Sequence, residues 1–212
     1  MIKVENIDVW GFEPAIRAMR NPMNSWKFSD SVFNHDYNEE FKDDVITIGM
    51  SDLDLMKRLF KAGAEHRTYA RMIQVSMDIT APLYWYKEAD RYSVGKSQVS
   101  CSTMHKIHAK EFTLDDFSTD HLLALSKDAL CGTIQVMNSY RKEYLDTKNK
   151  EYWWQLIQLL PTSYNQKRTV CMSYEVVFKM IKERTGHKLD EWNEFVNILK
   201  ELPYIEDIIK ED

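Results

Sequence analysis

The sequence has few of the residues that divide a chain into flexible or cross-linked parts. Only 6 of its 212 residues are glycine and 5 are proline, which leaves little material for a flexible linker. We therefore expect one domain, residues 1–212, with a single sizeable core. The three cysteines are an odd and widely spaced set, which favours reduced thiols in a cytoplasmic protein over a disulfide framework.

Long apolar runs and net positive charge are also missing. The opening residues, MIKVENIDVW, lack the uninterrupted apolar core of a signal peptide, and no later run approaches the length of a membrane helix. A net charge of -5 and a pI near 5.7 argue against a nucleic-acid-binding protein held by a general basic field. A local basic pocket for a small phosphate stays open, so the expected partner is a small molecule, with neither nucleic acid nor membrane.

Hydrophobic periodicity predicts a mixture of strands and helices. Polar and apolar residues alternate in residues 73–79, which is typical of a strand, and strands are also expected at 3–10 and 164–171. Helices are expected at 12–20, 51–63, 82–92, 119–147 in two pieces, 151–160, 174–184 and 188–202. Residues 21–44 read as a long loop whose part 34–44 is a solvated acidic surface, and the tail after Pro203 reads as frayed.

The stretch 63–105 carries most of the candidate chemistry. Polar residues open it, the alternating strand follows, and an aromatic and charged helix leads into the small polar segment SQVSCST at 97–103. Helix ends and turns rich in serine and threonine are where backbone N–H groups and hydroxyls can converge on a phosphate. This segment is therefore a candidate phosphate site.

An arginine ends the helix expected at 174–184. Arg184 follows Ile181 by three residues, so it lies at the edge of the apolar stripe and needs an anion. One interpretation is an internal carboxylate or the C-terminal carbonyls of the same helix. The other is a substrate phosphate or carbonyl oxygen, because a guanidinium makes charge-assisted hydrogen bonds to such oxygens.

A metal site is the third class considered. It rests on Cys101, His105 and His108, with His121 and Cys131 following in sequence. The spacing C-x-x-x-H-x-x-H matches no common zinc module, so we expect no metal.

Taken together, the order of elements and several residues resemble the flavin-dependent thymidylate synthases, the thymidylate-synthase-complementing (ThyX-like) family. The anchors are a histidine and threonine before a strand, the pair Ala81-Pro82 before a helix, and Leu160-Pro161 before a strand and a helix that ends at an arginine. In this sequence the histidine, the threonine and the arginine are His66, Thr68 and Arg184, and a His-x-x-x-x-Trp pattern follows at His187 and Trp192.

The family's signature, R-H-R-x-x-S-x-N-E-x-S-x-R-Y, is degenerate here. Aligned from Ala81-Pro82 without gaps, its first arginine falls on Arg91, and the next two positions fall on Tyr92 and Ser93. Its later part falls on residues 97–103, and a shift of one residue would put Gln98 at the acid and Ser100 at the serine. Further departures are Ile157, Ser173 and Glu175, which stand where the family has an arginine, an asparagine and an arginine.

The resemblance implies an α+β domain with a central mixed or antiparallel sheet packed with helices, and a homotetramer that binds FAD and dUMP between subunits. It implies reductive methylation of dUMP to dTMP with methylenetetrahydrofolate and NADPH as co-substrates, with Arg184 as the catalytic residue that polarises the pyrimidine. The alternative is a non-catalytic nucleotide- or flavin-binding protein on the same scaffold. On the resemblance, the cofactor would contact His66, Thr68 and Arg91, and the nucleotide would contact Lys87, Gln98, Ser100, Ser102 and Arg184.

Overall fold

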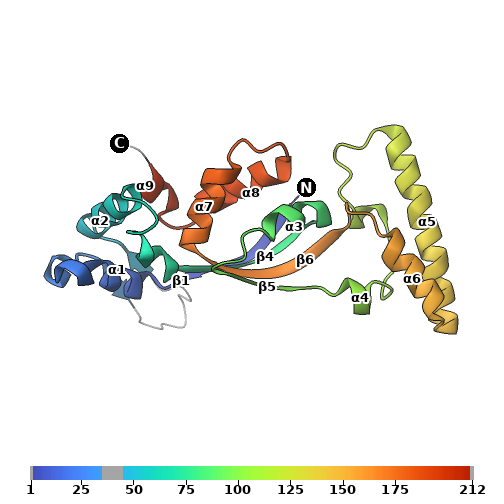
Figure 1. Cartoon of the computed structure of the whole chain (residues 1–212), viewed down its shortest axis with the longest axis horizontal. Coiled ribbons are helices and arrows are strands. Elements are labelled where there is room, and N and C mark those ends of the chain that lie inside the picture. The colour runs from blue at the N-terminus through green and yellow to red at the C-terminus, as the bar shows by residue number, and fades with distance from the viewer. Residues whose placement is uncertain (1, 35–44, 211–212) are drawn as a thin grey trace.

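A four-stranded antiparallel sheet forms the middle of the molecule in a computed structural model that describes residues 2–34 and 45–210 (Figure 1). Its order is β1 (Lys3–Trp10), β4 (Gln74–Pro82), β6 (Asn165–Ser173) and β5 (Lys96–Ser100). All three pairings are antiparallel, so the expected α+β fold is confirmed, with an antiparallel sheet. Strand β5 corrects the interpretation of residues 97–103 as a turn, because most of that segment pairs with β6.

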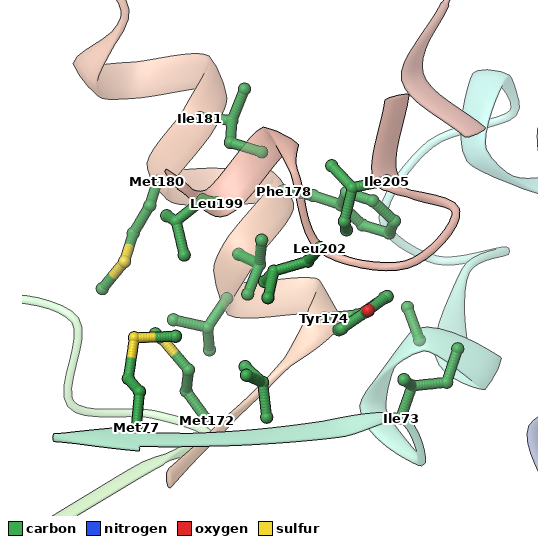
Figure 2. Packing of buried hydrophobic residues seen from close by; sticks show 14 of the residues in the cluster. Ile73, Met77, Met172, Tyr174, Phe178, Met180, Ile181, Leu199, Leu202 and Ile205 are labelled. Carbon is green, nitrogen blue, oxygen red and sulfur yellow. The ribbon is translucent and has the colours of Figure 1, made fainter. Parts of the chain in front are cut away.

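The alternation in β4 divides the sheet into an apolar and a polar face. Val75, Met77 and Ile79 are almost fully buried, whereas the side chains between them are only half-buried. Helices α3 (Leu83–Ala89), α7 (Tyr174–Arg184) and α8 (Asp190–Lys200) cover the apolar face (Figure 1). Figure 2 shows Met77 and Met172 pointing from the sheet toward Met180 and Leu199, so this face and its helices form the main core.

A group of short elements lies at the end of the sheet from which α7 begins (Figure 1). It contains α1 (Phe12–Arg20), η1 (Asn21–Met23), η2 (Trp26–Phe28), the hairpin of β2 (Val32–Asn34) and β3 (Val45–Thr47), α2 (Met50–Lys61), η3 (Thr68–Arg71) and α9 (Ile205–Ile209). The expected loop at 21–44 thus contains regular structure, and most of its acidic part, 35–44, lies outside the described residues. The frayed tail was a wrong prediction, because Ile205 and Ile208, three residues apart on one helix face, are completely buried.

The opposite end of the sheet carries a second helical group (Figure 1). It contains α4 (Thr103–Lys106), η4 (Leu114–Asp116), α5 (Ala124–Thr147) and α6 (Lys150–Leu159), which pack around a separate cluster that includes Phe112, Met137 and Leu156. Helix α5 is continuous, not two pieces, because it contains no proline and Gly132 alone does not interrupt it. Within the described residues, no helix is both long and apolar enough to cross a membrane.

Two boundaries near the centre of the chain also differ from expectation. Pro82 is the last residue of β4, opposite Asn165, and not the first residue of the next helix. The fixed φ of proline is compatible with a strand end and with the first residue of a helix, but its ψ of 151° is that of extended backbone. Helix α3 ends at Ala89 instead of residue 92, which leaves Arg91 and Tyr92 beyond its C-terminal end.

A buried ion pair joins the first two helices. Arg20 Nε donates to Asp52 Oδ1 at 2.6 Å, and the two side chains are 4% and 0% exposed. The other carboxylate oxygen accepts the hydroxyls of Ser29 and Ser31, both at 2.7 Å. Burial alone would raise the pKa of the Asp52 carboxyl, but the hydrogen bonds from Ser31, Ser29 and Arg20 lower it below the ordinary value.

We predict that D52N lowers the free energy of unfolding at pH 7 by about 3–5 kcal/mol, because it leaves the Arg20 guanidinium buried without its counter-charge. Chemical denaturation followed by circular dichroism measures the change. The matched control is D54N in the same helix, whose exposed ion pair with Arg58 contributes only about 0.5 kcal/mol.

The pH dependence of this difference has a defined sign. A lowered folded-state pKa makes the Asp52 contribution complete above about pH 4, the ordinary range of aspartate, and removes it as the pH falls through the lower folded value. The gap between wild type and D52N should therefore narrow below about pH 4. A gap that stays constant through that range would contradict the assignment of the effect to this carboxylate.

Candidate functional site

Arg184 lies in the last turn of α7 with only 11% of its side chain exposed. Its Nη2 atom is 3.0 Å from Glu88 Oε2, and its Nε donates to the Tyr92 hydroxyl at 2.8 Å. The guanidinium also lies over the Trp192 ring, 4.9 Å from its centroid. Of the two anions considered from the sequence, the internal carboxylate is therefore present, and it comes from α3.

Arg91 shares that carboxylate. Its Nη1 atom is 3.2 Å from the same Glu88 Oε2 that Arg184 contacts. The hydrogen bond from Arg91, followed by the charge of Arg184, holds the pKa of the Glu88 carboxyl below its ordinary value. One carboxylate oxygen thus serves two guanidinium groups, which leaves both with unused donors.

A depression of 360 Å³ opens beside these two arginines. Its lining residues are Arg91, Tyr92, Lys179, Glu183 and Arg184. The Tyr92 hydroxyl donates to Glu183 Oε2 at 2.9 Å while it accepts from Arg184, so it connects the two side chains. With Glu88 included, three cations meet two carboxylates, and the depression has an excess of positive charge suited to an anion.

Gln98 belongs to a neighbouring polar cluster. Its Nε2 donates to Asp90 Oδ1 at 2.8 Å, and Arg168 Nη1 donates to the same oxygen at 2.9 Å. The Arg168 guanidinium lies 3.7 Å from the centroid of the Tyr86 ring, and Lys96 donates to the carbonyl of Ala89 at 2.8 Å. These contacts attach the C-terminal end of α3 to strands β5 and β6, so the cluster stabilises the fold.

Of the two predicted serines, Ser100 is the last residue of β5 and Ser102 precedes α4. Ser100 is opposite Arg168 in the sheet, four residues along the strand from Lys96 and about 13 Å away. Ser102 accepts a hydrogen bond from the amide of His105 at 3.0 Å and lines a different cavity, of 390 Å³. Neither serine lines the depression beside Arg184, and no hydrogen bond joins either of them to Arg184 among the described residues.

His66 and Thr68 lie at the opposite end of α7 from Arg184. Both are exposed, and between them Arg67 pairs with Glu175 at 2.9 Å. Nine residues of helix separate Glu175 from Arg184, which is about 13 Å. Within one chain, His66 and Thr68 thus lie at the other end of α7 from Arg184 and its neighbour Arg91.

The remaining candidates are Lys87 and the possible metal ligands. Lys87 is exposed on α3, and no described residue pairs with its ammonium group. His121 is 3.1 Å from Asp190. Among the described residues, no group of three histidine, cysteine, aspartate or glutamate side chains is arranged to hold a metal ion.

Sequence analysis missed three lining residues of the depression, Tyr92, Lys179 and Glu183, and the neighbouring Glu88. Glu88 and Arg91 are three residues apart at the end of one helix, and Lys179 and Glu183 are four apart on another, so each pair carried a local signal. Tyr92 carried none, because its two partners lie more than 90 residues away in sequence. The pairing between the two helices depends on the sheet beneath them.

Comparison with known proteins identifies the fold. No protein-family model matches the sequence, and no curated protein matches it. The structure is similar to thymidylate synthase X (ThyX) from Helicobacter pylori with FAD and dUMP, with a TM-score of 0.68 and 15% identity over 100% of this chain and 98% of that chain. A second structure of that enzyme with FAD and dUMP has a TM-score of 0.66 and 14% identity over the same shares.

A third solved structure extends the likeness. The UMP/dUMP methylase PolB from Streptomyces cacaoi, bound with 5-Br UMP, has a TM-score of 0.56 and 14% identity, over 87% of this chain and 76% of that chain. Likeness at such low identity establishes the fold alone. The chain has a ThyX-like fold, which confirms the resemblance seen in the sequence at the level of architecture.

We predict that Y92F lowers the free energy of unfolding by about 1–3 kcal/mol, because it removes the hydroxyl that connects Arg184 and Glu183. Urea denaturation measures it. The control is Y140F, since the Tyr140 ring stacks on Tyr152 and its hydroxyl has no hydrogen-bond partner among the described residues. Equal losses in the two variants would contradict the bridging role.

Proposed function

We propose that this protein binds a pyrimidine nucleoside monophosphate, with an anionic or carbonyl oxygen of the nucleotide held in the depression beside Arg184. The observation that carries the proposal is the meeting of Arg91, Lys179 and Arg184 around a 360 Å³ depression. The fold supports it, because three similar structures contain dUMP or 5-Br UMP. A uridine nucleotide is thus common to these three.

The state of Arg184 suits such a ligand. Its guanidinium is already fixed between Tyr92 and Trp192, so binding would cost little of its conformational entropy. Each charge-assisted hydrogen bond to an anion contributes about 1.5–3 kcal/mol. The competing anion is Glu88, which a bound ligand would have to replace or join.

We further propose that the chain works as a cytoplasmic homo-oligomer, in agreement with the tetramer that the resemblance implies. Within one chain, Ser102 lines a different cavity from the depression beside Arg184, and His66 and Thr68 lie at the other end of α7. Contacts between copies are a way for such separated residues to share one ligand. The strongly exposed Leu123 and Leu125 at the start of α5 support association, because exposed apolar groups on one helix end favour burial by a partner.

Reductive methylation of dUMP is the second candidate function. The likeness to ThyX with FAD and dUMP over the full chain favours it. The substitutions at Tyr92, Ser93, Ile157 and Glu175 oppose it, because they remove groups that the resemblance assigns to binding and electrostatic stabilisation. Formation of dTMP by purified protein given FAD, methylenetetrahydrofolate and NADPH would establish this activity, and Lys87 and Gln98 would then be the next residues to vary.

We predict that the purified protein binds dUMP and that R184A weakens binding by about 10- to 100-fold, the loss expected for one charge-assisted hydrogen bond. Isothermal titration calorimetry measures both affinities. The control is R58A, which removes an exposed arginine from α2. No binding of dUMP by the wild type at millimolar concentration would refute the proposed function.

We predict that E88Q tightens dUMP binding by roughly threefold to tenfold, because it removes the carboxylate that occupies both arginines while it keeps the shape of the side chain. The same calorimetric titration detects the change, and E201Q, at the end of α8, is the charge-matched control. Weaker binding in E88Q would instead show that Glu88 positions Arg91 and Arg184 and does not compete with the ligand.

A further inference from the structure

The 390 Å³ cavity lies where the end of the sheet meets the second helical group. Residues of β4 and β6 form one side, and residues 101–116 form the other. Its volume lies within the range of small-molecule sites in proteins. None of its lining residues also lines the depression beside Arg184, so the two hollows are separate in the chain.

Part of the cavity wall is aromatic and apolar. Ile107 and Phe112 are buried members of the second hydrophobic cluster, and Tyr164 packs against it. The Phe112 and Tyr164 rings meet edge to face, with their centroids 6.4 Å apart. Such a wall favours a flat ring, which can pack against these two side chains.

The cavity also holds one cation without a counter-charge. Lys110 pairs with Asp116, and Lys167 is 3.0 Å from Asp78. The ammonium group of Lys106 has no ion pair or hydrogen bond among the described residues. Ser102 and Thr103 line the same cavity and lie close to Lys106 in sequence, so their hydroxyls can add hydrogen-bond donors there.

The lining carboxylates limit the charge of a ligand. Asp116 is neutralised by Lys110, whereas Asp115 is an exposed acid of the same 3-10 turn. A ligand with several negative charges would be repelled by Asp115, while a single negative charge can be met by Lys106. The expected ligand is therefore a monoanion.

We infer that this cavity is a second ligand site, which binds a small aromatic monoanion with its ring against Phe112 and Tyr164 and its charge at Lys106. The inference goes beyond the proposed nucleotide site, because it uses none of the residues of the depression beside Arg184. It also gives a role to Ser102, which the sequence analysis placed in a candidate phosphate site, in a cavity whose lining does not include Arg184.

The test uses the full chain and the aromatic sulfonate 8-anilinonaphthalene-1-sulfonate as the probe. We expect a fluorescence titration to give one strong site per chain, with an affinity about 10-fold lower in K106A. The variant K127A, which removes an exposed lysine from α5, should bind as the wild type does. Equal affinity in K106A and wild type would overturn the inference.

Cys101 supplies an independent measurement, because it lines the cavity and is exposed. The probe should slow the reaction of Cys101 with N-ethylmaleimide, as read by peptide mass spectrometry, and leave the half-buried Cys171 unchanged. A strong probe signal without protection of Cys101 would mean that the dye covers an apolar surface elsewhere, and would overturn the site. Displacement of the probe by dUMP with loss of Cys101 protection would also overturn it as a site separate from the nucleotide.

Discussion

The register of β4 between its two neighbours is the constraint on which the rest of the structure depends. Met77 lies opposite Val170 and Val75 lies opposite Met172, so the apolar side chains of both strands share one face. A slip of one residue would turn this set toward the polar face and expose it. This pairing of β4 with β6 also sets the positions of α3 and α7, which follow these strands, and so of the polar residues at the helix ends.

The antiparallel pairing also explains how the two arginines meet. Helix α3 follows β4 directly, and α7 follows β6 directly, so the two helices start from opposite ends of the sheet. Both turn back over the same apolar face, and they approach each other with their C-terminal ends (Figure 1). Residues beyond α3 and in the last turn of α7 therefore come together, which is how Glu88 contacts both Arg91 and Arg184.

Sequence reasoning succeeded where the signal is periodic and failed where it is tertiary. Helices α1 and α7 have the predicted limits, because both have regular apolar spacing, Pro14 lies in the first turn of α1 and Gly186 follows the end of α7. Strand β5, KSQVS, was missed because an edge strand that is mostly exposed needs no apolar alternation. Arg91 was assigned to the flavin and Arg184 to the nucleotide, but the structure places them together, because both contact Glu88. No local pattern in the sequence reports that contact.

The arginines of this chain are largely matched by internal carboxylates, and this constrains any function. Arg20 pairs with Asp52, Arg67 with Glu175, and Arg168 with Asp90, as Arg184 does with Glu88. Glu175 stands where the resemblance places an arginine, so a cation that would attract a ligand is replaced by an anion that holds a neighbouring arginine. The fold needs only the apolar alternation and the helix stripes, which persist at 15% identity. Anion binding needs positive charge in excess of these internal carboxylates, and beside Glu88 two guanidinium groups share one carboxylate oxygen.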